Sequence, residues 1–372
     1  MKESIFVTQP ALPPMKEFVS YLERIWDSKI LTNGGPLHNE LEAELASYLD
    51  APFVSLFCNA TQALIVAFQA LGIGEGEVIT SPYSFIATSH SICLNGLKPV
   101  FVDVEDEFFN LDPSKIEAAV TEKTKAIMPV HVYGNPAQVE KIDKIAKKYN
   151  LKVIYDAAHA FGVRYKEQSL VAYGDLSVLS FHATKVYSTI EGGAIIAKSQ
   201  EMKDRIDKLK NFGIKNENEV EMVGTNAKLN EFQAAYGLLD LKYVDEHVRK
   251  RKEVTESYHK KLNSVEGLTF LPEPQNCTLS YSYLPVIIDE KKFGISRDVL
   301  YEKLKEKQVF CRKYFYPLIT NTIAYRKMNI EQTQKFPVAE KITQQVMCLP
   351  LYVDLTEEEI RGVCQAIVEC KK

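Results

Sequence analysis

The chain has 372 residues, of which 46% are hydrophobic and 25% are charged, with a net charge of −4. This composition is that of a globular protein with a sizeable core, and the slight acidic excess argues against a nucleic-acid-binding protein. No apolar run reaches the roughly 20 residues of a membrane span, and seven scattered cysteines predict a cytoplasmic protein with reduced thiols and no metal site.

The first strand–turn–helix unit lies near residue 60. A strand is predicted over residues 53–58 and a helix over residues 63–71, with a small polar turn between them. Such a turn directs free backbone N–H groups and a helix dipole at an anion such as phosphate, and Thr61 adds a hydroxyl. A helix N-cap that binds no ligand explains Asn59 and Thr61 equally well.

Strands alternate with helices through the middle of the chain, which predicts a largely parallel sheet covered by helices on both faces. Asp156 directly follows the predicted strand 151–155, and His159 comes three residues later. Open α/β sheets bind ligands at this carboxyl edge of their strands. Asp156 alternatively caps a turn. The other strands predicted here span residues 77–80, 99–104 and 126–132.

Lys185 lies between two apolar strands that are predicted over residues 176–179 and 194–196. Burial lowers the pKa of a lysine from about 10.4, so that its amine becomes a nucleophile able to form Schiff bases. The alternative is a lysine at a strand end with its ammonium in solvent.

The last part of the chain changes character. A polar loop is predicted over residues 215–223, followed by helices over 230–241 and 245–262 and then by a mixture of short strands and helices. We therefore predict a large domain at residues 1–245 and a smaller C-terminal α+β domain at residues 246–372.

Three predicted strand ends thus present an anion-binding turn near Thr61, the carboxylate of Asp156 and the amine of Lys185. These are the groups that pyridoxal phosphate needs for its phosphate, its pyridine nitrogen and its aldehyde. The combination is more specific than any of its members.

At this point the chain resembles the DegT/DnrJ/EryC1/StrS family of sugar aminotransferases over nearly its whole length. The resemblance implies an α/β protein of fold type I, the aspartate aminotransferase-like fold, with a mostly parallel central sheet covered by helices. The resemblance rests on LTNGGP near residue 31, NATQAL at 59, SPYSFIAT at 81, KPVFVDV at 98, MPVHVYGNP at 128, YDAAHAFG at 155, SFHATK at 180, EGGA at 191 and NAKLNEFQAAYG at 226.

Roles within the site follow from the same resemblance. Lys185 would bind the cofactor as a Schiff base and shuttle a proton, and Asp156 would pair with the pyridine nitrogen. The other cofactor contacts that the resemblance implies are Ala60, Thr61 and Ser180 at the phosphate, Phe85 on the ring face, His159 near the ring hydroxyl, and Asn226 reaching the phosphate from the partner subunit of a homodimer. Two positions depart from the family pattern: Ala60 stands where glycine is usual, and Ala227 where an aromatic residue commonly follows the asparagine.

Lys185 favours transamination, because related dehydratases carry histidine at this position. L-glutamate would convert the cofactor to pyridoxamine phosphate, and a nucleotide-linked keto-sugar would then accept the amine. The closest resemblance is to enzymes that make dTDP-4-amino-4,6-dideoxy-D-glucose from dTDP-4-keto-6-deoxy-D-glucose for surface polysaccharide such as O-antigen, with 3-keto-sugar aminotransferases as the alternative. Candidate substrate contacts are His131, Tyr133, Tyr187 and Lys228.

Two rival functions remain open. One is another fold type I enzyme, such as a lyase acting on an amino acid, for which Arg312 is the candidate carboxylate-binding arginine. The other is a non-catalytic regulator, against which the intact Lys185 and Asp156 argue.

Overall fold

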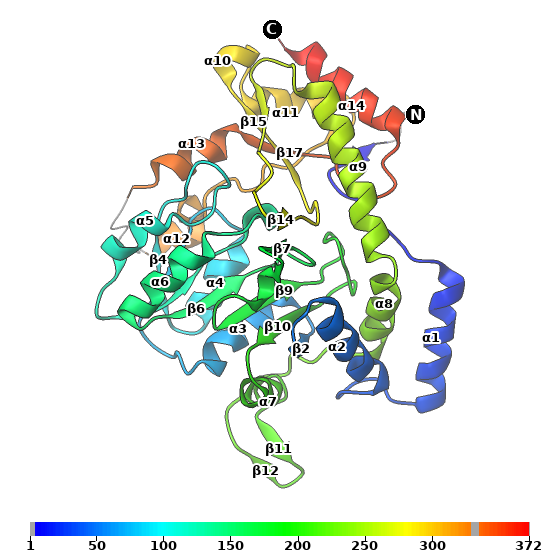
Figure 1. Ribbon diagram of the computed structural model, residues 1–372, viewed down its shortest axis with the longest axis vertical. Helices are drawn as coiled ribbons and strands as arrows, with labels where there is room; N and C mark the ends of the chain where they lie inside the picture. The colour runs from blue at the N-terminus through cyan, green and yellow to red at the C-terminus, as the bar shows by residue number, and fades with distance from the viewer. Residues whose placement is uncertain (1–3, 329–334, 372) are drawn as a thin grey trace.

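A seven-stranded sheet forms the centre of the molecule in the computed structural model, which describes residues 4–328 and 335–371 (Figure 1). Its strands lie in the order β2-β10-β9-β6-β5-β3-β4, and within this sheet only β10 runs antiparallel to its neighbours. The predicted α/β class with a mostly parallel sheet is confirmed. The strands span Phe53–Phe57 (β2), Glu77–Thr80 (β3), Lys98–Phe101 (β4), Thr124–Met128 (β5), Lys152–Asp156 (β6), Leu176–Ser180 (β9) and Gly193–Ala197 (β10).

Helices cover both faces of this sheet, which explains why its strands are mostly apolar and do not alternate strictly with polar residues. In β6, Val153 and Tyr155 point into one core and Ile154 points into the other. The first core also contains side chains from α2 (Pro36–Tyr48), α6 (Val139–Tyr149) and α8 (Glu231–Leu241). The second contains side chains from α3 (Ala60–Ala70), α4 (Ile86–Leu94) and α7 (Gln200–Leu209).

A separate hydrophobic core lies in the C-terminal part of the chain. An antiparallel sheet of β13 (Leu268–Phe270), β15 (Leu284–Ile288) and β17 (Val346–Leu349) packs there with α9 (Val244–Leu262), α11 (Arg297–Glu306) and α14 (Glu357–Cys370). The mixture is the α+β arrangement expected for this region. The division of the chain into domains near residue 245 stays a prediction.

The N-terminal segment contacts both parts of the molecule. β1 (Ile5–Phe6) pairs in parallel with β16 (Val309–Phe310), beside the C-terminal core. The following helix α1 (Met15–Ser28) packs against α8, on the side of the large sheet (Figure 1). The chain therefore crosses between the two parts once before α1 and again along α9.

Several predicted bounds differ from the structure. The strands predicted over residues 99–104 and 126–132 end earlier, at Phe101 and Met128. Helix α3 begins at Ala60 rather than at residue 63, because the Asn59 side chain accepts a hydrogen bond from the Gln62 N–H and caps the helix earlier. Residues 215–223 were predicted as a loop, but they contribute to a hairpin of β11 (Ile214–Asn216) and β12 (Glu219–Val220) that projects from the molecule (Figure 1). Lys215 pairs with Glu219 at 3.2 Å, so charged side chains stabilise the ribbon.

The smaller elements connect these layers. None of the helices in residues 4–328 and 335–371 is long and apolar enough to cross a membrane. The remaining elements are α5 (Pro113–Ile116), β7 (Arg164–Tyr165), β8 (Gln168–Ser169), β14 (Cys277–Thr278), α10 (Glu290–Phe293), α12 (Ile323–Lys327), α13 (Pro337–Gln345) and the 3-10 turns Glu117–Ala119, Val132–Gly134, Leu170–Ala172 and Ile319–Asn321.

Candidate active site

A cavity of about 320 Å³ lies at the carboxyl edge of the central sheet. The ends of β2, β6 and β9 reach it through Asn59, Asp156 and Ser180, because parallel strands present their carboxyl ends at one edge. Of the residues predicted to hold the cofactor, this one cavity brings together Ala60, Thr61, Phe85, Asp156, His159, Ser180 and Lys185.

Lys185 lies in the segment between β9 and β10, and its amine faces the cavity. The Nζ atom donates a hydrogen bond to the Tyr283 hydroxyl at 3.0 Å. Burial lowers the pKa of Lys185 to about 8, against the opposing attraction of the Asp156 carboxylate. The amine is therefore partly neutral, and nucleophilic, near neutral pH.

Asp156 is the last residue of β6 and is only 5% exposed. Its Oδ2 accepts a hydrogen bond from the Thr88 hydroxyl at 2.7 Å, and its Oδ1 accepts one from the Ala158 N–H at 3.2 Å. Burial raises the pKa of this carboxyl, while the two hydrogen bonds oppose the rise. A cation beside Asp156 would stabilise the buried carboxylate and lower its pKa.

The N-terminus of α3 forms another side of the cavity. The first N–H groups of a helix have no partner within it, and the Asn59 side chain occupies only that of Gln62. The N–H groups of Ala60 and Thr61 therefore remain available to an anion. Gly193 of β10 packs directly behind them, since a Cβ at this position would lie 2.7 Å from the Ala60 nitrogen.

His159 is held as a neutral ring. Its Nδ1 accepts a hydrogen bond from the Tyr133 N–H at 3.2 Å, and its ring stacks on Phe315 with the centroids 5.9 Å apart. Burial holds the pKa of His159 well below its ordinary value. Because Nδ1 accepts, the proton of the neutral imidazole lies on Nε2.

The candidate substrate contacts lie elsewhere. His131 accepts a hydrogen bond from the Ala137 N–H and stacks on Tyr155, while Tyr187 stacks on Phe161 with the centroids 4.4 Å apart. Both rings are fully buried in the large core. Among the described residues that line the cavity, none is His131, Tyr133, Tyr187, Asn226 or Lys228.

Asn226 and Lys228 lie on the surface segment that precedes α8. Lys228 Nζ donates to Asn226 Oδ1 at 2.9 Å, and the Asn226 side chain is exposed. Ala227 between them is buried, and its carbonyl accepts the Cys58 N–H at 2.8 Å. The departure from the family pattern at Ala227 therefore falls where the segment packs against the end of β2.

The C-terminal part of the chain forms the rest of the cavity wall through Tyr283, Arg312, Tyr314 and Phe315. Of these four residues, only Arg312 is a candidate from the sequence. The sequence shows aromatic clusters here, but such clusters are also common in hydrophobic cores, so they do not by themselves indicate a cavity wall. Thr88, the partner of Asp156, was also missed, because it lies within a helix rather than at a strand end.

The family model of the DegT/DnrJ/EryC1/StrS aminotransferases matches residues 14–368. The dTDP-4-amino-4,6-dideoxy-D-glucose transaminase of Shigella dysenteriae is 49% identical over the whole of both chains, and its Escherichia coli counterpart is 49% identical over 98% of each.

Solved structures agree with this match. The structure of DesI in the presence of its TDP-sugar product superimposes with a TM-score of 0.95 at 32% identity, over 100% of this chain and 93% of DesI. Helicobacter pylori PseC, an aminotransferase of pseudoaminic acid biosynthesis, superimposes with a TM-score of 0.92 at 26% identity, over 99% of each chain. The chain therefore belongs to the DegT/DnrJ/EryC1/StrS aminotransferase family, whose members use pyridoxal phosphate.

Proposed function

We propose that this protein transfers the amino group of L-glutamate to dTDP-4-keto-6-deoxy-D-glucose and so makes dTDP-4-amino-4,6-dideoxy-D-glucose, for a surface polysaccharide such as O-antigen. One observation carries the proposal: full-length 49% identity to a transaminase named for this sugar. The cavity that contains Lys185 and Asp156 provides the chemistry such an enzyme needs. The free cysteines favour a cytoplasmic location.

The residues of the cavity fit pyridoxal phosphate. The available N–H groups of Ala60 and Thr61, with Ser180, would bind the phosphate, and the buried Asp156 would pair with the protonated ring nitrogen. When bound, the cofactor supplies an electron sink for the carbon that gains or loses the amine. Lys185 would bind the aldehyde, with His159 near the ring hydroxyl and Phe85 over the ring face.

Lys185 is also suited to proton transfer. A pKa of about 8 leaves its amine partly neutral at neutral pH. With the cofactor bound, Nζ would take a proton from the substrate carbon and return it to complete the transfer. Four aromatic side chains line the cavity that this amine faces: Phe85, Tyr283, Tyr314 and Phe315.

We further propose that the enzyme works as a homodimer in which Asn226 completes the partner's site. Asn226 is exposed and does not line the cavity of its own chain. Exposed apolar side chains on the neighbouring helices α1 and α8, among them Trp26 and Phe232, favour an interface there.

Mixing two inactive variants tests the shared site. Lys185→Ala and Asn226→Ala chains, coexpressed with different tags, should recover about one quarter of wild-type activity, because half of random dimers are mixed and each has one intact site. If Asn226 acted within its own chain, the mixture would stay as inactive as its components.

The substrate is tested with purified enzyme. We expect L-glutamate to bleach the absorbance band of the bound cofactor and dTDP-4-keto-6-deoxy-D-glucose to restore it, with 2-oxoglutarate and the 4-amino sugar identified by mass spectrometry. Restoration only by a 3-keto isomer would favour the alternative, for which the 32% identical dTDP-3-amino-3,6-dideoxy-alpha-D-galactopyranose transaminase of Aneurinibacillus thermoaerophilus is a relative.

Arg312 remains the candidate for an anionic group of the substrate. It is exposed and lines the cavity. A guanidinium at this position would bind the carboxylate of the amino donor or a phosphate of the nucleotide sugar. Arg312 would therefore bind an anionic substrate group in a transaminase as well as in a lyase, and its presence does not favour the lyase.

A further inference from the structure

The amine of Lys185 has a polar partner from a distant part of the chain. Its Nζ donates to the hydroxyl of Tyr283, 98 residues later in the sequence, at 3.0 Å. The same Nζ lies 5.6 Å from the centroid of the Tyr283 ring. Tyr283 directly precedes β15, so the contact joins the C-terminal wall of the cavity to the sheet edge.

The Tyr283 ring is fixed by other aromatic rings. It packs edge-on against His159, with the centroids 4.7 Å apart, and against Tyr314 at 5.5 Å. The neighbouring Ser282 hydroxyl donates to the His159 carbonyl at 2.8 Å, which holds the backbone in place. The hydroxyl therefore reaches Lys185 from a ring whose position other contacts set.

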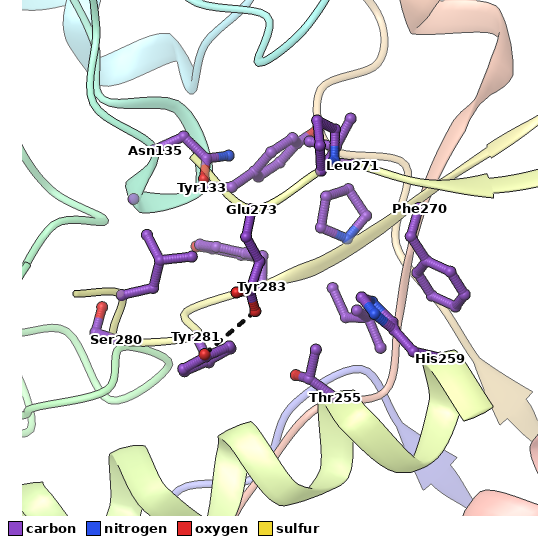
Figure 2. Close-up of a pocket in the computed structure, with 15 residues that line it drawn as sticks. Tyr133, Asn135, Thr255, His259, Phe270, Leu271, Glu273, Ser280, Tyr281 and Tyr283 are labelled. Carbon is purple, nitrogen blue, oxygen red and sulfur yellow. Dashed lines mark hydrogen bonds between the residues drawn. The ribbon is translucent and has the colours of Figure 1, made fainter. Parts of the chain in front are cut away.

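Tyr283 also separates two cavities. Besides the active-site cavity it lines a smaller one of about 60 Å³, which is shown in Figure 2. In that smaller cavity the Tyr281 hydroxyl donates to Glu273 at 3.3 Å (Figure 2). Two tyrosines two residues apart thus have their hydroxyls in different surroundings.

We propose that Tyr283 is a catalytic residue that holds the Lys185 amine whenever this amine is not bound to the cofactor. The proposal rests on the transaminase function above, in which Lys185 is released while it moves a proton. A tyrosine hydroxyl accepts a hydrogen bond from an ammonium and donates one to a neutral amine. Tyr283 can therefore keep its contact with Nζ while Nζ gains the substrate proton and gives it back.

The protonation state of Tyr283 fits this role. Burial raises the pKa of its hydroxyl far above neutrality, so Tyr283 keeps its own proton throughout. The proton that moves passes only between the substrate carbon and Nζ, and the tyrosine turns its O–H bond without losing it. No other reactant is required.

The test compares Tyr283→Phe with Tyr281→Phe as the matched control. Each variant loses one hydroxyl and keeps its ring, so the aromatic contacts of Tyr283 remain. In cofactor-free protein, the rate of acetylation at Lys185 is measured against pH by peptide mass spectrometry. We expect Tyr283→Phe to lower the apparent pKa of Lys185 by roughly one pH unit, because the ammonium loses its acceptor, and Tyr281→Phe to leave it unchanged.

In the loaded enzyme, Tyr283→Phe should reduce kcat roughly tenfold with KM near its wild-type value. Equal Lys185 titration and equal kcat in the two variants would overturn the proposal. A wild-type enzyme that does not transaminate the keto-sugar would instead refute the proposed function, while the titration of Lys185 would still report on Tyr283.

Discussion

The two walls of the active-site cavity are built differently. The sheet-edge wall presents a few polar groups whose positions are set by strand ends and a helix start, as Asp156 and Lys185 illustrate. The C-terminal wall consists of aromatic rings and one exposed arginine, and its residues Arg312, Tyr314 and Phe315 follow β16 outside any regular strand. The first wall is suited to chemistry and the second to recognising and covering the substrate, with Tyr283 linking them.

The largest effect should come from the lysine of the sheet-edge wall. Lys185→Ala is expected to reduce kcat by roughly 1,000-fold or more, because the proposed function assigns both the binding of the aldehyde and the proton transfer to this amine. Steady-state kinetics and the cofactor absorbance band measure this. Lys198→Ala, at an exposed lysine just beyond β10, is the control and should keep both. Retained activity in Lys185→Ala would contradict the assignment of the chemistry to the sheet-edge wall.

Asp156→Asn should have the next largest effect. The amide keeps an acceptor for the Thr88 hydroxyl but loses the negative charge, so we expect kcat to fall roughly 100- to 1,000-fold. Kinetics with saturating substrates measure the loss, and the exposed Asp143→Asn serves as the control. A loss below tenfold would mean that the carboxylate does not act on the cofactor.

Arg312→Gln tests the C-terminal wall. Loss of its guanidinium should raise KM for one substrate roughly tenfold, with kcat nearly unchanged, because charge-assisted hydrogen bonds of this kind contribute about 1.5 kcal/mol. Separate titrations of L-glutamate and the nucleotide sugar identify which substrate it binds. Arg326→Gln, on the exposed face of α12, should leave both KM values as they are. A change confined to kcat would contradict the assignment of recognition to this wall.

Thr88→Val should produce a smaller change with a distinctive pH dependence. Losing the hydroxyl removes a hydrogen bond that lowers the pKa of Asp156, so this carboxyl will protonate at higher pH. The acidic limb of the kcat profile should move upward in pH, and kcat should fall about threefold to tenfold. An unchanged pH profile would show that Thr88 does not tune Asp156.

Asp240→Asn should affect stability more than catalysis. Asp240 accepts the Ser188 N–H at 2.9 Å, and burial raises its pKa to about 7. The folded chain therefore keeps a proton that the unfolded chain releases near pH 4, so this contribution to stability declines as pH rises from about 4 to 7. Urea unfolding across this range should show a weaker decline in the variant, and identical pH dependence in both proteins would refute the assignment.

The sheet-edge wall could be predicted from sequence because its residues lie at or shortly after the ends of buried strands. Asp156 ends β6 and Lys185 lies in the segment after β9, and parallel strands bring such positions to one edge. The C-terminal wall could not, because Tyr283 meets Lys185 only through packing across 98 residues. His131 and Tyr187 lie beyond strand ends too, yet their rings are buried because they stack on Tyr155 and Phe161.

The pairing of β1 with β16 has a consequence for biosynthesis. Ile5 can pair only after Val309 has been synthesised, and the neighbouring Ser4 and Gln308, which share a hydrogen bond, are 304 positions apart. At roughly 5–20 residues per second, the ribosome needs about 15–60 s to supply the partner strand. Until then the strand edge near the N-terminus is unpaired, while the sheet around β6 already has its neighbours. The pairing of β1 with β16 therefore forms late. A chaperone or fused tag that covers the first residues would delay this pairing without disturbing the central sheet.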